Sequence, residues 1–223
     1  MSLYMSVTRL ARDDDGGPLV EVAVTLPLLI MFLLGGVDLL NAFYQWNAAA
    51  KAVELGARIA AVSDPVASGL NALPDNALSP TVALGSPMPA FTIVCDGGEA
   101  TCACTGAACG GTGAYSDEAM DFIVYGRRGK KACAPVRSEY FAGMCNIFER
   151  ILPQYVTVTY TQTGLGFAGR SLGPVPTITV SLNDGSSKFK LPFKFYFLPF
   201  TAVPVPSVTT TITAEALSSS AVE

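Results

Sequence analysis

The sequence predicts an α+β protein: a long N-terminal transmembrane helix, then a mainly antiparallel β-sheet head with short helices and a disulfide-rich loop. Three observations support this prediction. The run Val22–Val37 contains no charged residue. All six cysteines follow that run, between positions 95 and 145. Apolar and polar residues alternate in the C-terminal third, which is the period of β-strands.

The apolar run is long enough to cross a membrane. With its flanks it extends to about Phe43, interrupted only by Asp38 and Asn41, and a bilayer core requires about 20 apolar residues. The alternative is a cleaved signal peptide. The run is longer than such peptides use, and the nearest small-residue site, at residues 48–50, lies beyond the charged Asp38. We therefore expect an anchor, with its N-terminus held on the cytoplasmic side by Arg9 and Arg12.

Several residues of the run suit a helix that packs in a membrane. Pro27 and the pair Gly35-Gly36 are tolerated there, and small residues allow neighbouring helices to approach closely. We predict helix packing at Pro27, Gly35 and Gly36. Tyr44 and Trp46 lie where an interfacial aromatic belt is expected.

The helical pattern continues beyond the run. Apolar residues recur at helical spacing, namely Leu39, Leu40, Phe43, Trp46, Ala50, Val53, Ala57, Ala60 and Ala61. The helix is expected to end near Val62, before Ser63-Asp64-Pro65. This stripe packs on its own head, on sister helices in an assembly, or on both with different faces, and the sequence leaves these alternatives open.

One carboxylate, Glu21, lies at the start of the apolar run. A charge at a bilayer centre costs roughly 2.5–3.5 kcal/mol, and less near an end. We therefore expect Glu21 to have a partner or a task; the alternative is that its side chain reaches back to the cytoplasmic interface.

The cysteines are expected to form disulfides in an extracytoplasmic head. They are Cys95, Cys102, Cys104, Cys109, Cys133 and Cys145. The alternative, a metal or iron–sulfur site, fits less well because the spacing matches neither zinc nor ferredoxin patterns. Three bridges allow 15 connectivities, and the sequence does not choose among them.

Composition argues against several classes of function. The chain has no histidine, which removes the usual catalytic base and the commonest zinc ligand. The net charge of −4 gives no argument for nucleic acid as a partner. We expect no enzyme activity, no catalytic residues, no metal and no cofactor.

The head is expected to contain two helices. Residues 63–90 are rich in Ala, Pro, Ser and Asn and predict a loose loop, and residues 95–114 show no periodicity. Ser116 opens a helix that Gly126 closes. A second helix is expected from Ser138 to Pro153.

Four strands are expected after the second helix. Their alternating apolar residues are Val156, Val158 and Tyr160; Ile178, Val180 and Leu182; Phe189 to Phe197 at every second position; and Val208 to Ala216 likewise. Asn183-Asp184-Gly185 predicts a hairpin between the second and third strands, and Pro192 predicts an edge position or a bulge.

Two further motifs are explained by ordinary local structure and do not require a functional site. The basic cluster Arg127-Arg128-Gly129-Lys130-Lys131 is more simply a solvated loop than a contact for an acidic surface. Asp184-Gly185-Ser186-Ser187 has the wrong serine spacing for a metal-ion-dependent adhesion motif, and a turn explains it.

The N-terminal fifth of the chain contains an ordered set of motifs: Gly16-Gly-Pro-Leu-Val-Glu21, a Leu- and Pro-containing span, Leu39-Leu-Asn-Ala-Phe-Tyr44, and Ala52-Val-Glu-Leu-Gly-Ala-Arg58-Ile-Ala. With this set the chain resembles the TadE-like family of minor pilins or pseudopilins of the tight-adherence (Flp) pilus system. The resemblance covers residues 16–62.

The resemblance implies cleavage by a prepilin peptidase between Gly16 and Gly17, with Glu21 as the fifth mature residue. Departures from the family pattern are Val22 in place of an aromatic residue, Pro18 near the cut, and the acidic residues 13–15. The expected organisation is a prepilin-type leader (1–16), a transmembrane and protruding helix (17–62), a linker (63–94) and an extracytoplasmic α+β head (95–223).

The resemblance implies a structural pilus-assembly protein, single-pass in the bacterial inner membrane, with a periplasmic head. Its implied partners are the prepilin peptidase, other pilins, assembly-platform proteins and membrane lipid. The alternative is an uncleaved membrane-tethered binding module.

Overall fold

The computed structural model describes residues 17–71, 82–106, 109, 114–126, 131–133, 141–170, 174–184, 189–199, 203–215 and 217. The chain divides into two compact units. The first is Met1–Phe43 with Lys194–Thr201, and the second is Tyr44–Phe193 with Ala202–Glu223. The predicted leader, residues 1–16, lies outside the described residues.

Helix α2 (Gly17–Val62) contributes to both units. It ends where the sequence places Ser63-Asp64-Pro65, as expected from the proline. Pro27 lies inside the helix and does not end it. The long N-terminal helix of the predicted fold class is therefore confirmed.

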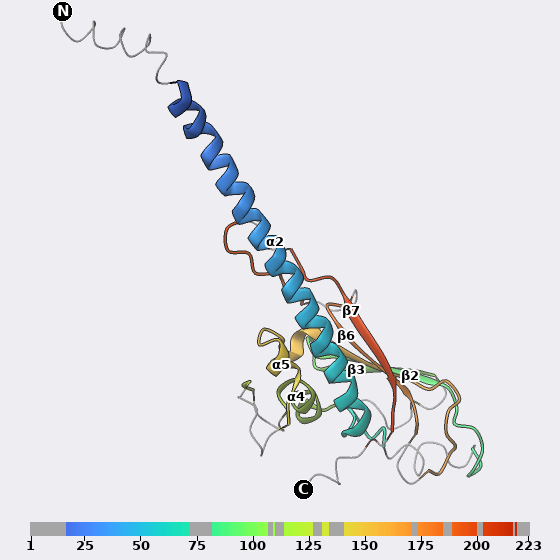
Figure 1. Ribbon diagram of the computed structural model, residues 1–223. Helices are drawn as coiled ribbons and strands as arrows, with labels where there is room; N and C mark the ends of the chain where they lie inside the picture. The colour runs from blue at the N-terminus through green and yellow to red at the C-terminus, as the bar shows by residue number, and fades with distance from the viewer. Residues whose placement is uncertain are drawn as a thin grey trace, which may run out of the picture. The chain divides into compact units, whose positions relative to one another are not determined.

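An antiparallel sheet forms the centre of the second unit. Within the described residues, five strands pair in the order β3 (Thr101–Gly106), β2 (Phe91–Asp96), β5 (Val156–Thr161), β6 (Thr177–Leu182) and β7 (Val208–Thr213). Every neighbouring pair is antiparallel. Figure 1 shows the strands β2, β3, β6 and β7 by label. A small separate sheet pairs β1 (Ala67–Ser68) with β4 (Ala114–Tyr115).

One face of the large sheet is buried. The alternating apolar residues of three strands are almost fully inaccessible: Phe91, Ile93 and Cys95 of β2; Val156, Val158 and Tyr160 of β5; Ile178, Val180 and Leu182 of β6. The same core contains an alanine-rich stripe of α2: Ala49, Ala52, Val53, Ala57, Ala60 and Ala61. Residues 49–61 thus pack on their own head, one of the alternatives left open by the sequence. The earlier residues of the predicted stripe, Leu39, Leu40, Phe43 and Trp46, are exposed instead.

Helix α4 (Asp117–Tyr125) forms as predicted. The Ser116 hydroxyl accepts the N–H of Ala119 at 3.3 Å, and Gly126 ends the helix in the left-handed conformation with φ +71°. Since Gly126 closely approaches Phe141 O, a side chain has no room there. Two more short elements follow, α5 (Met144–Ile147) and the 3-10 turn η2 (Pro153–Tyr155).

The expected second helix, from Ser138 to Pro153, is wrong over its C-terminal part. The described helix is the single turn α5, and residues 134–140 lie outside the described residues. Phe148 donates its N–H to Met144 O but has extended backbone angles, so the helix stops. The apolar residues that suggested a longer helix, Phe148 and Ile151, are buried in a turn instead.

Two further expectations for the head are corrected. Residues 95–106 are not an irregular loop, because Cys95 belongs to β2 and residues 101–106 form β3, its hairpin partner. The described residues between 63 and 94 are packed more tightly than a linker, because Val66, Ala67, Leu70 and Met88 are buried. These small or scattered apolar residues gave no periodic signal.

The expected strand over residues 189–197 is also wrong. β6 pairs with β7 instead, and among the described residues this segment makes only the isolated bridge between Pro192 and Pro204. Proline has no N–H to give to a ladder. The buried Asn183 side chain bonds both the N–H and the C=O of Leu191, so a side chain replaces a strand partner.

Candidate membrane-anchoring site

The N-terminal part of α2 exposes an unusual amount of apolar surface. Large exposed side chains occupy most positions from Leu19 to Phe43, with Phe32 79% exposed. Soluble monomers rarely expose apolar patches of this extent. Among the described residues, one helix, over Leu19–Val62, is long and apolar enough to be a candidate membrane span by length and composition.

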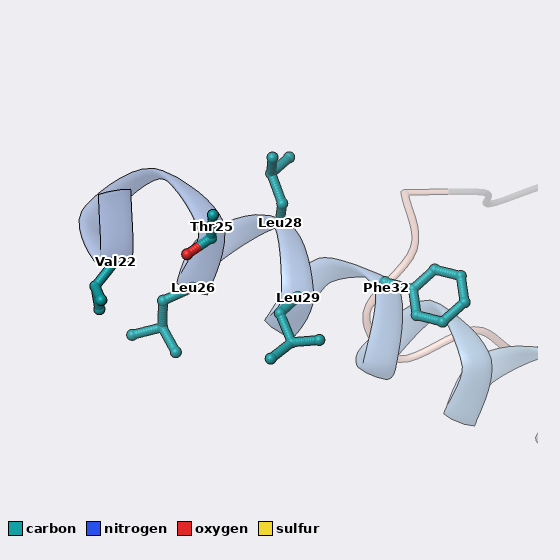
Figure 2. A pocket seen from close by; sticks show the side chains of 6 residues that line it. All are labelled: Val22, Thr25, Leu26, Leu28, Leu29 and Phe32. Atoms are coloured by element: carbon teal, nitrogen blue, oxygen red, sulfur yellow. The ribbon is translucent and has the colours of Figure 1, made fainter. Parts of the chain in front are cut away.

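The surface of this helix has shallow hollows rather than a closed pocket. One hollow of about 520 Å³ is lined by Val22, Thr25, Leu26, Leu28, Leu29 and Phe32. Figure 2 shows that all six side chains project from α2 itself. Such a surface suits lipid chains or another helix better than a small molecule, which requires a concave site.

Both predicted packing glycines line a second hollow. Gly35 and Gly36 line a space of about 510 Å³ with Leu28, Met31, Phe32, Leu39 and Leu198. A Cβ added at Gly36 would meet nothing within 4 Å, whereas one at Gly35 would lie 3.8 Å from Leu198 Cδ2. Pro27, the third predicted packing residue, is not part of this lining.

Glu21 lies on the exposed first part of the helix. Its backbone carbonyl accepts a hydrogen bond from the Thr25 hydroxyl at 2.8 Å. Gly17 begins the helix, and Gly16 lies outside the described residues. The processing role predicted for Gly16, Gly17 and Glu21 therefore stays a prediction.

The structure reveals a second carboxylate site on the helix, at Asp38. Its side chain accepts three successive backbone N–H groups: Tyr196 at 2.9 Å, Phe197 at 2.8 Å and Leu198 at 2.6 Å. Asp38 is fully buried by this arrangement. Successive N–H groups that converge on an anion form a compact anion-binding concavity, and bonds to an ionised acceptor are stronger than neutral ones. We call residues 194–199 the strap tip.

Two more contacts hold the strap tip to the helix. The Asn41 amide donates to Lys194 O at 2.9 Å, and Leu198 lies against Gly35. The Lys194 ammonium lies 5.1 Å from the centre of the Tyr196 ring, within the range of a cation–π interaction. In the sequence, Asp38 and Asn41 interrupt the apolar run. A charge in such a run requires a partner, and this requirement is the sequence signal that points to Asp38 as a site.

The residues beside the strap tip are fixed within the second unit. Phe193 donates its N–H to Val203 O, and Val205 donates to Leu191 O, both at 2.8 Å. Asn183 also donates to Val205 O at 2.7 Å. Arg150 donates to Pro192 O and to the Gln45 side chain, each at 2.8 Å.

All six cysteines are paired, as predicted, and the structure gives the connectivity. The bridges are Cys95–Cys102, Cys104–Cys109 and Cys133–Cys145. Cys95 and Cys102 are direct cross-strand partners in the β2–β3 hairpin. No cluster of three or more potential metal ligands occurs among the described residues.

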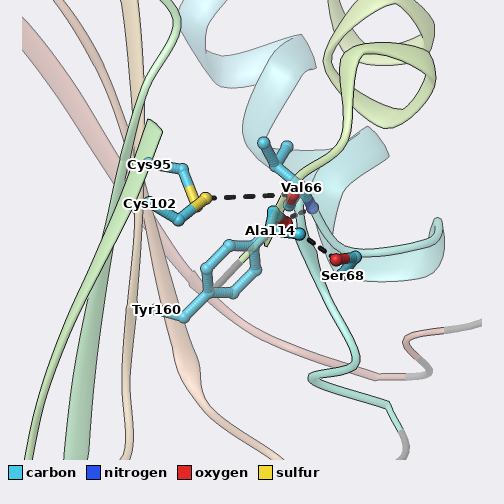
Figure 3. The surroundings of a disulfide bond; sticks show 6 residues. All are labelled: Val66, Ser68, Cys95, Cys102, Ala114 and Tyr160. Atoms are coloured by element: carbon cyan, nitrogen blue, oxygen red, sulfur yellow. Dashed lines mark hydrogen bonds between the residues drawn. A yellow bond between two sulfur atoms is a disulfide. The ribbon is translucent and has the colours of Figure 1, made fainter. Parts of the chain in front are cut away.

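The first bridge lies beside a buried polar contact, shown in Figure 3. The Tyr160 hydroxyl accepts the N–H of Val66 at 2.9 Å, and burial raises the pKa of Tyr160. Val66 O accepts the N–H of Ser116 at 2.8 Å, and Ser68 Oγ donates to Ala114 O. These bonds fix the chain that leaves α2 against the sheet.

The fold and the exposed helix define a class: an α+β head joined to one long helix with the properties of a membrane anchor. Comparison with known proteins adds one finding. Residues 19–58 match the model of the family described as TadE-like protein. This confirms the resemblance seen in the sequence and suggests involvement in the tight-adherence pilus system. No curated protein and no solved structure matches the chain.

The matched range coincides with the helix rather than with the head. Residues 19–58 include the exposed apolar stretch, Glu21, Asp38 and most of the buried alanine stripe. An apolar helix in this position fits a membrane-anchored pilus protein.

Proposed function

We propose that this chain is a structural minor pilin or pseudopilin that takes part in assembly of a tight-adherence pilus, anchored in the bacterial inner membrane by α2. The observation that carries the proposal is the coincidence of the family match with an exposed apolar helix. On this proposal the N-terminus is cytoplasmic, the head is periplasmic, and the protein has no enzyme activity.

The length of the apolar stretch supports a spanning role. Asp38 follows Glu21 by 17 residues, which is about 26 Å of helix at 1.5 Å per residue. A bilayer core is about 30 Å thick. A helix with Glu21 near one boundary therefore carries Asp38 close to the other.

The role proposed for Glu21 follows from its position. If a prepilin peptidase cuts between Gly16 and Gly17, the new amino group lies one helical turn before Glu21 on its own chain. In an assembly, Glu21 pairs with the free amine of a neighbouring subunit, which offsets the cost of its burial in lipid. Gly35 and Gly36 offer a small-residue surface for an adjacent helix.

N-terminal analysis of the protein from native membranes tests this proposal. We expect a mature chain that begins at Gly17, and an uncut chain in a Gly16→Leu variant. A Gly36→Ala variant serves as a control, because it lies in the same helix but far from the cut. An intact leader in the wild-type protein would contradict processing and favour an uncleaved, disulfide-bonded binding module. A start after residues 48–50 would show signal-peptide cleavage and contradict the anchor.

A further inference from the structure

We propose that the strap tip, residues 194–199, is a second membrane-contacting element that lies in the lipid headgroup interface at the outward end of the span. This inference rests on the proposed function, since it requires α2 to cross a bilayer. The occupant is the lipid surface itself. Nothing in the family match covers this segment, because the match ends at residue 58.

The depth of the strap tip is fixed by Asp38. Three backbone N–H groups of the tip lie within 2.6–2.9 Å of its carboxylate. The tip therefore lies at the level of Asp38, about 26 Å along the helix from Glu21. That level is the boundary between hydrocarbon and headgroups when Glu21 lies near the opposite boundary.

The three hydrogen bonds to Asp38 also remove the usual obstacle to placing irregular backbone beside lipid. Unpaired N–H groups are costly near the hydrocarbon, because no water is available to satisfy them. Here the N–H groups of Tyr196, Phe197 and Leu198 are satisfied by Asp38. The carboxylate is in turn shielded, with no exposed surface of its own.

The side chains that the tip presents outward are those of a membrane interface. Tyr196 is 64% exposed and Phe197 is 54% exposed. Tyrosine is enriched at the headgroup level because its ring is apolar and its hydroxyl is polar. Lys194, which lies over the Tyr196 ring, brings a cation to the headgroup level, where the charged ends of lysine side chains lie at the ends of a span. Leu198 packs inward against Gly35.

Tryptophan fluorescence in vesicles tests the inference on the full chain. The sequence contains one tryptophan, Trp46, so Trp46→Phe gives a silent background. Tyr196→Trp then reports the strap tip, and Phe32→Trp reports the middle of the span. Each protein is reconstituted into phosphatidylcholine vesicles brominated either near the glycerol or near the bilayer centre. A Phe197→Ser change in the Tyr196→Trp protein removes the neighbouring exposed aromatic side chain.

We expect Trp at position 196 to be quenched about twice as strongly by the shallow bromines as by the deep ones, and Trp at position 32 to show the reverse order. Adding Asp38→Asn weakens shallow quenching at position 196 and leaves position 32 unchanged. Adding Phe197→Ser also weakens it.

Three results would overturn the inference. If Trp at position 32 is quenched while Trp at position 196 is unquenched and emits as in water, the helix spans the membrane but the strap tip does not contact lipid. Unquenched but blue-shifted emission at 196 shows that protein, such as a second copy, covers the tip. Absence of quenching at both positions removes the membrane span, and with it both the proposed function and this inference.

Discussion

The Asp38 carboxylate accepts the backbone N–H of Leu198 at 2.6 Å, although 160 positions separate the two residues. This contact joins the apolar helix to a segment that follows the sheet strand β6 in the sequence. Together with the N–H groups of Tyr196 and Phe197, it gives this charged residue inside an apolar run three backbone donors. It also brings two aromatic side chains, Tyr196 and Phe197, to one level of the helix.

Replacing Asp38 by asparagine should release the strap tip. Asparagine keeps one acceptor oxygen and loses the charge, so the three converging N–H groups lose most of their partner. We expect amide hydrogen exchange at residues 196–198 to accelerate by roughly tenfold or more, because bonds to charged acceptors are the stronger ones. Exchange is measured by mass spectrometry on the full chain in lipid nanodiscs.

Glu54→Gln is the matched control for that experiment. Glu54 lies on the same helix and pairs with Arg58 at 2.6 Å and Lys51 at 3.5 Å, all on the exposed surface. Exposed pairs contribute little to stability, so exchange at 196–198 should not change. Equal exchange in Asp38→Asn and wild type would mean that the carboxylate does not hold the tip.

Gly126→Ala should destabilise the head. Gly126 has φ +71° and would place a Cβ in conflict with Phe141 O. The left-handed conformation alone costs about 1–2 kcal/mol for a residue with a Cβ, and the steric conflict adds to it. Thermal unfolding followed by circular dichroism should show a lower midpoint.

Gly164→Ala separates the two contributions. Gly164 also has positive φ, +94°, but a Cβ there meets nothing within 4 Å. It should lose only the conformational part and unfold at a higher temperature than Gly126→Ala. If Gly164→Ala is the less stable of the two, the steric explanation is wrong.

Tyr160→Phe should lower the free energy of unfolding, because it removes the buried hydrogen bond to Val66. Removing the hydroxyl leaves the N–H of Val66 without its acceptor in the core. An unsatisfied buried donor costs about 1–3 kcal/mol. Ser68→Ala, which removes an exposed bond in the same segment, should cost clearly less in chemical denaturation. Equal losses of stability in the two variants would mean that the buried bond of the Tyr160 hydroxyl contributes no more than the exposed bond of Ser68.

Asp121→Asn should stabilise the head at neutral pH. Burial raises the pKa of the Asp121 carboxyl, the Asp117 charge adds to this, and Lys131 opposes it. The folded state therefore holds the proton more tightly than the unfolded state, and stability falls as pH rises from the ordinary pKa of 3.8 through the raised one. The asparagine variant lacks this loss.

The melting temperature of Asp121→Asn should exceed that of wild type at pH 7, and the difference should shrink as the pH falls through the raised pKa of Asp121 towards 3.8. Glu118→Gln is the control, because Glu118 is exposed in the first turn of α4, where an acid is favourable. It should not raise the midpoint. A difference for Asp121→Asn that grows on acidification would reverse the sign and refute this explanation.

Local signals in the sequence predicted much of the head correctly. The alternation in β5 and β6 depends on residues close together in the sequence, and so do the helix caps Ser116 and Gly126. These elements can therefore be predicted from the sequence alone. By contrast, β3 consists of small residues such as Cys102, Ala103 and Cys104. A strand without large apolar residues has no detectable period.

The segment from 189 to 197 shows what alternation does not determine. Its period of two was real, but a period reports which side chains share a face and not which segment pairs with which. Asn183 takes both backbone groups of Leu191, and β7 takes the edge of β6. The partner of Asp38 was hidden for the same reason, since it depends on tertiary contacts.

The most direct test of the proposed role in pilus assembly is the effect of Glu21 on surface fibres. In cells of the native host that lack the wild-type copy, Glu21→Ala and the control Glu54→Ala are expressed at equal levels, and fibres are counted by electron microscopy. We expect fibres to be lost or strongly reduced with Glu21→Ala and to remain with Glu54→Ala. Normal maturation and normal fibre numbers with Glu21→Ala would contradict the account.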